Sequence, residues 1–340
     1  MPSLCTLYPN RLTVFPEPRH RTINDLLDRK VAQWEKTQIE YKYRENFKVQ
    51  KKSFELSPAT KKKLFESINT MYELSTPRNI NMKSGKTIYN FRMSFITLTL
   101  PSVQRHSDIE LKNNCLNQLL VELRRYYKFH NYIWKAELQS NGNLHFHILS
   151  DCYVDYQALR RRWNRILSKL GYVDRYQERM GNLSLSDYHK LRNLKKSYSF
   201  QSSAAAYAQG KKSNWKNPNS VDVRSVNSKK SLAGYLAKYI SKASQKSELS
   251  ESDQERLRTF GRSFGRSQSL SRLRYKHRFL YEDLKGLIDI FKNSGEAVHT
   301  YVGEWCTVFY FRLDQLDKGV SKWISKMIRI NAQHYSYPFP

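Results

Sequence analysis

The sequence has few cysteines, no long apolar run and no secretion-type N-terminus. The four cysteines (Cys5, Cys115, Cys152 and Cys306) are widely spaced and form no Cys-x-x-Cys pair, which argues against a zinc or disulfide framework. No run of 18 apolar residues is present, so no segment is predicted to span a membrane. The first residues are not basic and then apolar, so we expect no signal peptide, and a reducing cytoplasm fits best.

Acidic residues are also scarce relative to basic ones. The chain has 59 Lys and Arg but only 30 Asp and Glu, which gives a formal net charge of +29. Charge of this size favours a polyanionic partner, and without a membrane span nucleic acid is the better candidate. The 340 residues, of which 39% are hydrophobic, suffice for one large domain or two smaller ones. The stretch 151–245 is the most basic, with 19 basic residues against 6 acidic ones.

Strands interleaved with helices and joined by a tight hairpin predict an α+β fold or a mixed sandwich. Strands are expected at 93–100, 132–139, 144–149, 221–226, 298–302 and 307–311, and helices near 57–74, after a capping box at 107–110, at 156–170 and at 228–243. Residues 1–50 look irregular, 174–220 look polar with a loop, and 246–275 look mobile or directed towards nucleic acid.

We divide the chain into three parts on this basis. Residues 1–90 form a basic N-terminal extension with one helix, 91–245 form the core, and 246–340 form a basic linker and a C-terminal segment that packs on the core.

The motif His145-Phe146-His147 lies on a predicted strand, so both imidazoles share a face and are able to bind one divalent ion. Glu137 and Gln139 on the preceding strand are the candidates for a third ligand. A two-residue turn at Asn141-Gly142 would turn Glu137 away, whereas a three-residue loop, 141–143, would pair Gln139 with His145 and Glu137 with His147. We predict the three-residue loop. The ligand set suits Mg or Mn, and also Zn.

Tyr235 and Tyr239 are four residues apart and therefore share one face of a predicted helix. Each is followed three residues later by a lysine, Lys238 or Lys242. A lysine beside a phenol favours the phenolate and neutralises a phosphate, which suits a tyrosine that attacks phosphorus. For an arbitrary pair the alternative is an aromatic stripe packed in a core.

Basic faces and one tryptophan are the candidate DNA contacts. Trp215 lies among lysines and is expected to stack on an unpaired base. The remaining candidates are Arg160, Arg161, Arg162, Arg165, Lys211, Lys212, Arg258 and Arg262.

Together these motifs resemble those of the HUH endonucleases, the superfamily of rolling-circle replication initiators. Phe95-Ile96-Thr97-Leu98-Thr99-Leu100, the two histidines and the segment 235–242 follow the family's order, and Arg258-Thr259-Phe260-Gly261-Arg262-Ser263 resembles a later segment. The paired tyrosines look most like those of initiators from single-stranded DNA phages, the microviruses and their gokushovirus-like relatives. The resemblance covers about residues 91–267.

The resemblance implies an RRM-like α+β fold, in which helices flank a central antiparallel sheet. It also implies Glu137 as the third metal ligand and Mg or Mn as the metal. It implies a nick in the viral strand, a 5′-phosphotyrosine intermediate and a free 3′-OH. One tyrosine would hold the old 5′ end while the other cuts the new junction, after which the strand is closed into a circle, and the order of the two tyrosines stays open. Host polymerase and host helicase in a bacterial cytoplasm would be the partners. Ser84-Gly85-Lys86-Thr87 resembles the end of a P-loop but lacks its first glycine, so it predicts no helicase activity.

Three alternatives remain open from the sequence. The first is a nucleic-acid-binding protein that keeps an HUH-like fold without catalysis. The second is a relaxase or transposase of the same superfamily, although the doubled tyrosines favour a phage initiator. A metallohydrolase with a water nucleophile would leave the tyrosines unexplained.

Overall fold

The computed structural model describes residues 4–15, 58–82, 84–139, 141–194, 197–228, 231–232, 235, 256, 260, 262–272, 277–303 and 306–329 of the chain. It divides into two compact units. One unit combines residues 1–76 with 268–340, and the other is continuous from 77 to 267. These limits differ from the sequence-based boundaries at 90 and 245, because strands from the two ends of the chain pair with each other.

The sheet of the continuous unit carries the three candidate metal ligands, Glu137, His145 and His147. Its five antiparallel strands have the order β8-β5-β7-β6-β9. They comprise β5 (Met93–Leu98), β6 (Tyr132–Leu138), β7 (Leu144–Ser150), β8 (Val221–Val226) and β9 (Phe264–Arg266). The first four confirm the predicted strands. β9 falls in the stretch 246–275, for which no strand was predicted.

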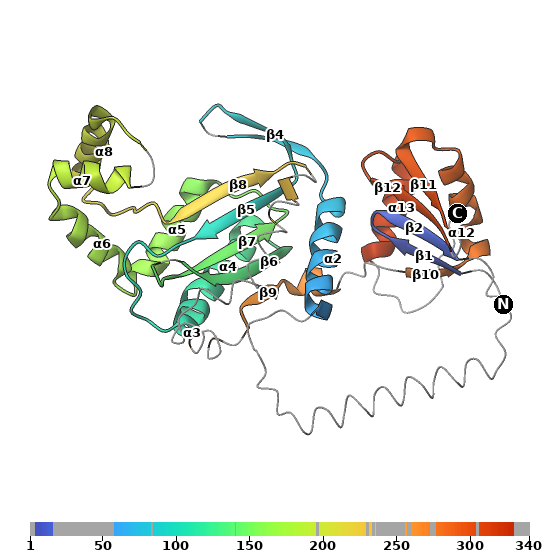
Figure 1. Cartoon of the computed structure of the whole chain (residues 1–340), viewed down its shortest axis with the longest axis horizontal. Helices are drawn as coiled ribbons and strands as arrows, with labels where there is room; N and C mark the ends of the chain where they lie inside the picture. Colours follow the sequence, from blue (N-terminus) through green and yellow to red (C-terminus); the bar gives the residue numbers. More distant parts are fainter. Residues whose placement is uncertain are drawn as a thin grey trace, which may run out of the picture. The chain divides into compact units, whose positions relative to one another are not determined.

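Helices cover one face of this sheet (Figure 1). The capping box at Ser107 opens a continuous helical stretch of α3 (Asp108–Glu110), the π-helical η1 (Leu111–Leu116) and α4 (Asn117–Tyr127). In α5 (Tyr156–Ser168), the buried Trp163 contacts Phe146 edge to face and donates a hydrogen bond to the Thr99 carbonyl. Phe146 therefore points towards the helices, and His145 and His147 point to the opposite face.

Three helices occupy the stretch 174–220, where the sequence suggested a loop. They are α6 (Tyr172–Gly181), α7 (Leu185–Asn193) and α8 (Phe200–Lys212), and they lie together beyond α5 in Figure 1. Ser184 and Ser199 cap the last two. A small core of Met180, Tyr188 and Trp215 holds this lobe together. At least α6 had a signal in the sequence, since Tyr172, Val173, Tyr176 and Met180 follow helical spacing.

The hairpin of β3 (Arg78–Asn81) and β4 (Thr87–Phe91) completes the continuous unit. Its turn contains Gly85 with φ of +80°. The resemblance to a P-loop therefore falls in a hairpin turn rather than between a strand and a helix.

The second unit has a five-stranded antiparallel sheet with the order β10-β1-β2-β12-β11. The strands are β1 (Leu4–Tyr8), β2 (Arg11–Phe15), β10 (His277–Leu280), β11 (Val298–Val302) and β12 (Thr307–Phe311). The last two confirm predicted strands, whereas β1 and β2 correct the irregular interpretation of residues 1–50. Alternating Cys5 and Leu7 pair with Val14 and Leu12, so these inward residues form a core.

Helices accompany this second sheet. Their bounds are α2 (Pro58–Leu74), α11 (Gln268–Arg272), α12 (Tyr281–Lys292), the 3₁₀ turn η4 (Gly295–Ala297) and α13 (Lys318–Arg329). α2 coincides with the helix predicted near 57–74. None of the helices described is long and apolar enough to cross a membrane.

Candidate active site

The register of the β6–β7 hairpin brings three potential metal ligands to one face. Glu137 pairs directly with His145, and Lys135 pairs with His147. The prediction that Gln139 would pair with His145 is wrong by two residues, since the Gln139 N–H instead donates to the Asn143 carbonyl. The shift is even, so it preserves the sheet face, and Glu137 still lies beside both histidines.

The donor atoms of Glu137, His145 and His147 converge. The Glu137 Oε2 lies 3.4 Å from His145 Nε2 and 3.4 Å from His147 Nε2, and one donor atom from each residue lies within 4.8 Å of the others. Two ligands of one ion at about 2.1 Å and a right angle would be about 3.0 Å apart, so this spacing is near that of a coordination sphere. Two imidazoles and a carboxylate fit a divalent cation.

Neighbouring groups orient the two imidazoles. Thr97 on β5 contacts His147 Nδ1 through its hydroxyl at 3.1 Å, which leaves Nε2 directed towards Glu137. Such a contact on the remote nitrogen is typical of histidine ligands. The Nδ1 atom of His145 is buried and has no hydrogen-bond partner among the described residues. Its Nε2 atom is therefore the nitrogen that the surrounding structure engages.

Lys135 stabilises the charge of Glu137 and was not identified from the sequence. Its Nζ lies 2.9 Å from Glu137 Oε1, and the lysine is only 9% exposed. Burial disfavours the charged carboxylate, but hydrogen bonds from both histidines and the Lys135 charge outweigh burial and hold the pKa of Glu137 well below its usual range. The sequence did contain a signal for this contact, because Lys135 lies two residues before Glu137 on the same strand and therefore on the same face of the sheet.

Burial favours the neutral form of His147. It lowers the pKa of His147, while the hydrogen bond to Glu137 acts in the opposite direction. The net lowering favours the neutral imidazole, which is the charge state of a histidine ligand.

Tyr235 lies on the same face of the sheet as these ligands. The preceding Ser228 caps its helix, because the Ser228 hydroxyl accepts from the Ser231 N–H. The Tyr235 ring stacks on Phe95 with centroids 4.2 Å apart, and Phe95 stacks on His147 at 5.2 Å. The Phe95 ring therefore contacts both Tyr235 and His147, which is one of the candidate ligands.

Four further predicted residues lie outside the described part of the chain. They are Lys238, Tyr239, Lys242 and Arg258.

Two of the arginines of α5 form ion pairs with an acidic residue. Arg162 and Arg165 both contact Glu122, and Arg160 lies over the Tyr156 ring. Arg161 is exposed. Part of the positive charge predicted for this face is therefore offset by Glu122.

The prediction of Trp215 as a base-stacking platform is contradicted. Trp215 is 7% exposed and packs against Tyr188 and Tyr207 in the helical lobe. Lys211 and Lys212 are exposed, although Lys211 also donates to the Gly181 carbonyl. Aromatic character and flanking lysines do not distinguish a surface platform from the core of a small lobe. Arg262 is exposed, as predicted for a DNA contact.

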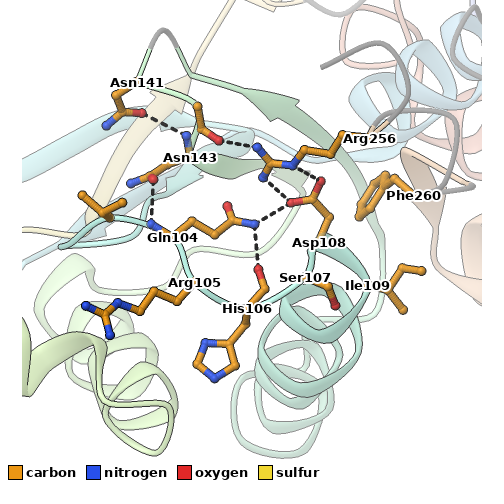
Figure 2. Close-up of a pocket in the computed structure, with 12 residues that line it drawn as sticks. Gln104, Arg105, His106, Ser107, Asp108, Ile109, Asn141, Asn143, Arg256 and Phe260 are labelled. Atoms are coloured by element: carbon orange, nitrogen blue, oxygen red, sulfur yellow. Dashed lines mark hydrogen bonds and ion pairs between the residues drawn. The ribbon is translucent and has the colours of Figure 1, made fainter. Parts of the chain in front are cut away.

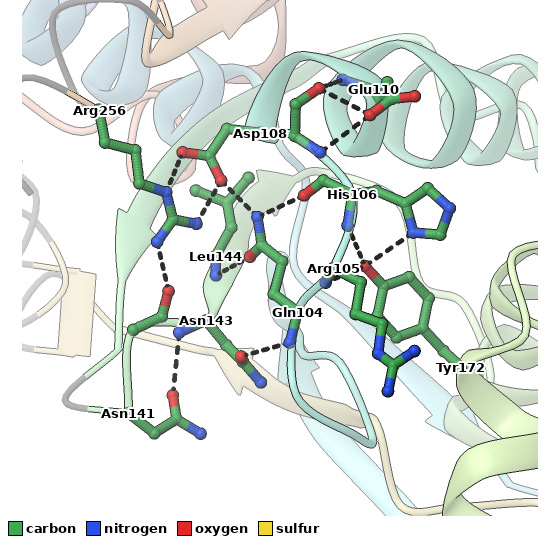
Figure 3. Close-up of polar contacts among 12 residues, drawn as sticks. Gln104, Arg105, His106, Asp108, Glu110, Asn141, Asn143, Leu144, Tyr172 and Arg256 are labelled. Atoms are coloured by element: carbon green, nitrogen blue, oxygen red, sulfur yellow. Dashed lines mark hydrogen bonds and ion pairs between the residues drawn. The ribbon is translucent and has the colours of Figure 1, made fainter.

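A polar clamp fixes the end of the metal-site hairpin, as Figures 2 and 3 show. Arg256 donates to the Asp108 carboxylate and to the Gly142 carbonyl. The Gln104 side chain accepts a hydrogen bond from the Leu144 N–H and donates one to the Asp108 carboxylate. The Gln104 backbone N–H donates to the Asn143 side-chain oxygen. These contacts join the loop between β5 and α3, the β6–β7 hairpin and Arg256.

The clamp borders a cavity of about 490 Å³, which Val103, Arg105 and Ile109 also line. Sequence reasoning missed it because its members are far apart in the chain and follow no motif.

Comparison with known families bears on the part of the chain that holds this site. Residues 93–244, somewhat under half of the chain, match the family described as replication-associated protein ORF2/G2P. The matching segment includes the three candidate ligands and Tyr235. Neither a curated protein nor a solved structure shows a significant match to the chain. The family match supports a role in the initiation of replication, with DNA as the partner.

Proposed function

We propose that the protein is a site-specific, single-strand DNA endonuclease and ligase that initiates rolling-circle replication of a circular phage genome. The observation that carries the proposal is the stack of Tyr235, Phe95 and His147 on the sheet face that also holds Glu137 and His145. A nucleophile and a potential metal centre on one face are the parts that metal-assisted covalent catalysis needs.

The residues Glu137, His145 and His147 would hold the cation, which we propose to be Mg or Mn. When bound, the cation supplies positive charge that polarises the scissile phosphate. Lys135 keeps Glu137 ionised, and Thr97 orients His147. Phe95 restricts the position of the Tyr235 ring. The tyrosine would therefore lose less conformational entropy when it reaches the geometry for attack.

In the proposed reaction the Tyr235 oxygen forms a bond to phosphorus and loses its proton. The bond from phosphorus to the 3′ oxygen breaks, which releases a 3′-OH and leaves a 5′-phosphotyrosine. Tyr239 would cut the new junction while Tyr235 still holds the old 5′ end. The 3′-OH that this second cut releases would then attack the Tyr235 phosphotyrosine, which closes the circle and frees the Tyr235 oxygen, and Lys238 and Lys242 would balance phosphate charge. The 3′-OH from the first cut would prime host polymerase behind a host helicase in the bacterial cytoplasm.

Exposed basic side chains would hold the DNA strand. Arg161, Lys212 and Arg262 are exposed in the continuous unit, and Arg258 is close to Arg262 in sequence. They would contact phosphates and contribute affinity that weakens with salt.

A denaturing-gel assay with labelled single-stranded DNA that includes the origin tests the proposal. The wild type with Mn or Mg should give a covalent adduct that survives denaturation, and His147→Ala should not. Tyr235→Phe and Tyr239→Phe, alone and together, rank the two tyrosines. Tyr89→Phe is the matched control, because Tyr89 is an exposed tyrosine on β4.

Retarded DNA without cleavage under either metal would reject the catalytic proposal in favour of a nucleic-acid-binding protein. An adduct that persists in the double Phe variant would reject the tyrosine nucleophiles.

A further inference from the structure

The unit formed by the two ends of the chain has one packed sheet face and one open face. Its inward residues, such as Leu12 and Phe309, join the core with residues of α12 and α13 such as Leu287 and Ile324. Alternate residues on each strand point the other way. We call the surface that they form the open face.

The open face combines aromatic and basic side chains and lacks acidic ones. Among the described positions its residues are Leu4, Thr6, Tyr8, Arg11, Thr13, Phe15, Arg278, Leu280, His299, Tyr301, Val308 and Tyr310. No Asp or Glu occurs in this set. Thr6, Thr13 and Val308 in the middle of the face are buried. The accessible members are aromatic residues around them, since Tyr301 is 57% exposed, Tyr310 is 44% exposed and Phe15 is 40% exposed.

One row of this face crosses four strands without interruption. Arg11 pairs with Tyr8 on one side and with Tyr310 on the other, and Tyr310 pairs with His299. The Arg11 guanidinium lies 3.9 Å from the Tyr8 ring centroid, and the His299 and Tyr310 rings are 6.5 Å apart. The row thus carries three rings and one arginine, and Arg278 and Tyr301 end the adjacent row.

We propose that the open face binds single-stranded DNA, separately from the candidate active site. Aromatic rings on a sheet offer stacking surfaces to unpaired bases, and arginines between them contact phosphates. A duplex hides the flat faces of its bases, so this arrangement fits a single strand. A protein partner is less suited to it, because nothing on the face opposes the two arginines and the chain carries a net charge of +29.

The choice of DNA over RNA rests on the proposed function, whereas the stacking surface does not. In a reaction that displaces a strand, such a face would hold DNA that the cleavage site has released.

Photocrosslinking of the full-length chain in EDTA tests the proposal without cleavage. The probe is a labelled 30-nucleotide DNA strand substituted with 5-iododeoxyuridine, and crosslinked peptides are mapped by mass spectrometry. We expect crosslinks at Tyr301 or Tyr310, whose side chains are exposed. The double variant Tyr301→Ala, Tyr310→Ala should lose these crosslinks and bind the strand about tenfold more weakly, as expected for the loss of stacked bases.

Phe65→Ala is the matched control, because Phe65 is an exposed aromatic residue of the same unit that lies on α2. It should leave the crosslinks and the affinity unchanged. Arg11→Gln gives an independent measurement that needs no aromatic substitution. It should lower the slope of log affinity against log salt by about 0.7, the value for one phosphate contact on a single strand.

Crosslinks confined to residues 77–267, together with unchanged affinity in the double variant, would overturn the proposal. Tighter binding of an RNA strand of the same sequence would overturn the choice of DNA. A change in oligomeric state of the double variant in light scattering, with DNA affinity unchanged, would identify a protein interface instead. The catalytic proposal fails separately, if open-face crosslinks form in a chain that gives no covalent adduct with Mn.

Discussion

Tyr235 and Phe95 stack with their ring planes only 20° apart, although the two residues are separated by 139 positions in the sequence. Phe95 is 5% exposed and lies on β5, between β7 and β8. Because a central strand has little freedom to shift, Phe95 is a rigid support for the tyrosine. The same ring stacks on His147, so one residue serves both halves of the candidate active site.

Phe95→Leu should slow cleavage while preserving metal affinity. The leucine keeps an apolar side chain in the core but removes the flat surface under Tyr235, and small misplacements of reacting groups cost up to about 100-fold in rate. We expect single-turnover cleavage to fall about 10- to 100-fold, with Mn affinity by calorimetry unchanged. Phe129→Leu, a buried phenylalanine that stacks on Tyr132, is the control. Equal rates for both variants would contradict a positioning role.

Glu137→Gln should weaken metal binding. The substitution keeps the size of the side chain but removes the charge that His145, His147 and Lys135 surround. Because a ligand carboxylate is lost, we expect Mn affinity by calorimetry to fall by at least about tenfold. Glu122→Gln removes a carboxylate that contacts Arg162 and Arg165 instead, and it should leave Mn affinity unchanged. Unaltered binding by Glu137→Gln would exclude this residue as a ligand.

Asp108→Asn should destabilise the continuous unit through the clamp. Asp108 is 6% exposed and accepts charged hydrogen bonds from Arg256, so its neutralisation should cost about 2–3 kcal/mol of unfolding free energy. Urea unfolding measures the loss. Asp174→Asn on α6 is the control, because Asp174 is exposed and its variant should unfold at the wild-type midpoint. A wild-type midpoint for Asp108→Asn would show that the clamp contributes nothing to stability.

Gly265→Ala should disturb the pairing of β9 with β6. A methyl group at this position would lie 2.5 Å from the Trp134 Nε1, so the indole must move. Overpacking of this kind costs about 1–3 kcal/mol and should change the tryptophan fluorescence of the folded protein. Gly181→Ala meets no atom within 4 Å and should be neutral or slightly stabilising. A Gly265→Ala variant with wild-type fluorescence and stability would argue against this close approach.

The strands of the candidate active site could be predicted because their patterns are local. Residues 93–98 and 144–150 alternate or run apolar between clear stops, and the structure has β5 and β7 there. The predicted register of the β6–β7 hairpin was wrong by two residues. Several hairpin loops of similar free energy fit the sequence around Asn141-Gly142, so the sequence does not select one of them. The metal ligands still met, since only an odd shift would have moved Glu137 to the other face.

Other features were not predicted from the sequence. The lobe of α6, α7 and α8 depends on a few aromatic contacts of Trp215. From the sequence, the lysines around Trp215 suggested an exposed platform instead. Lys135 acquires its role only beside Glu137, within a buried site.

The sequence by itself determined the basic character of this protein, half of its described strands and the side chains that form the candidate metal centre. Those properties follow from composition and from periodicities of two and 3.6 residues, which act over short stretches. Only the tertiary structure decided that β1 and β2 pair with β10 and β12, that Phe95 lies between Tyr235 and His147, and that Arg256 closes on Asp108. Such contacts join residues far apart in the chain, and their free energy depends on a packing that no local pattern specifies.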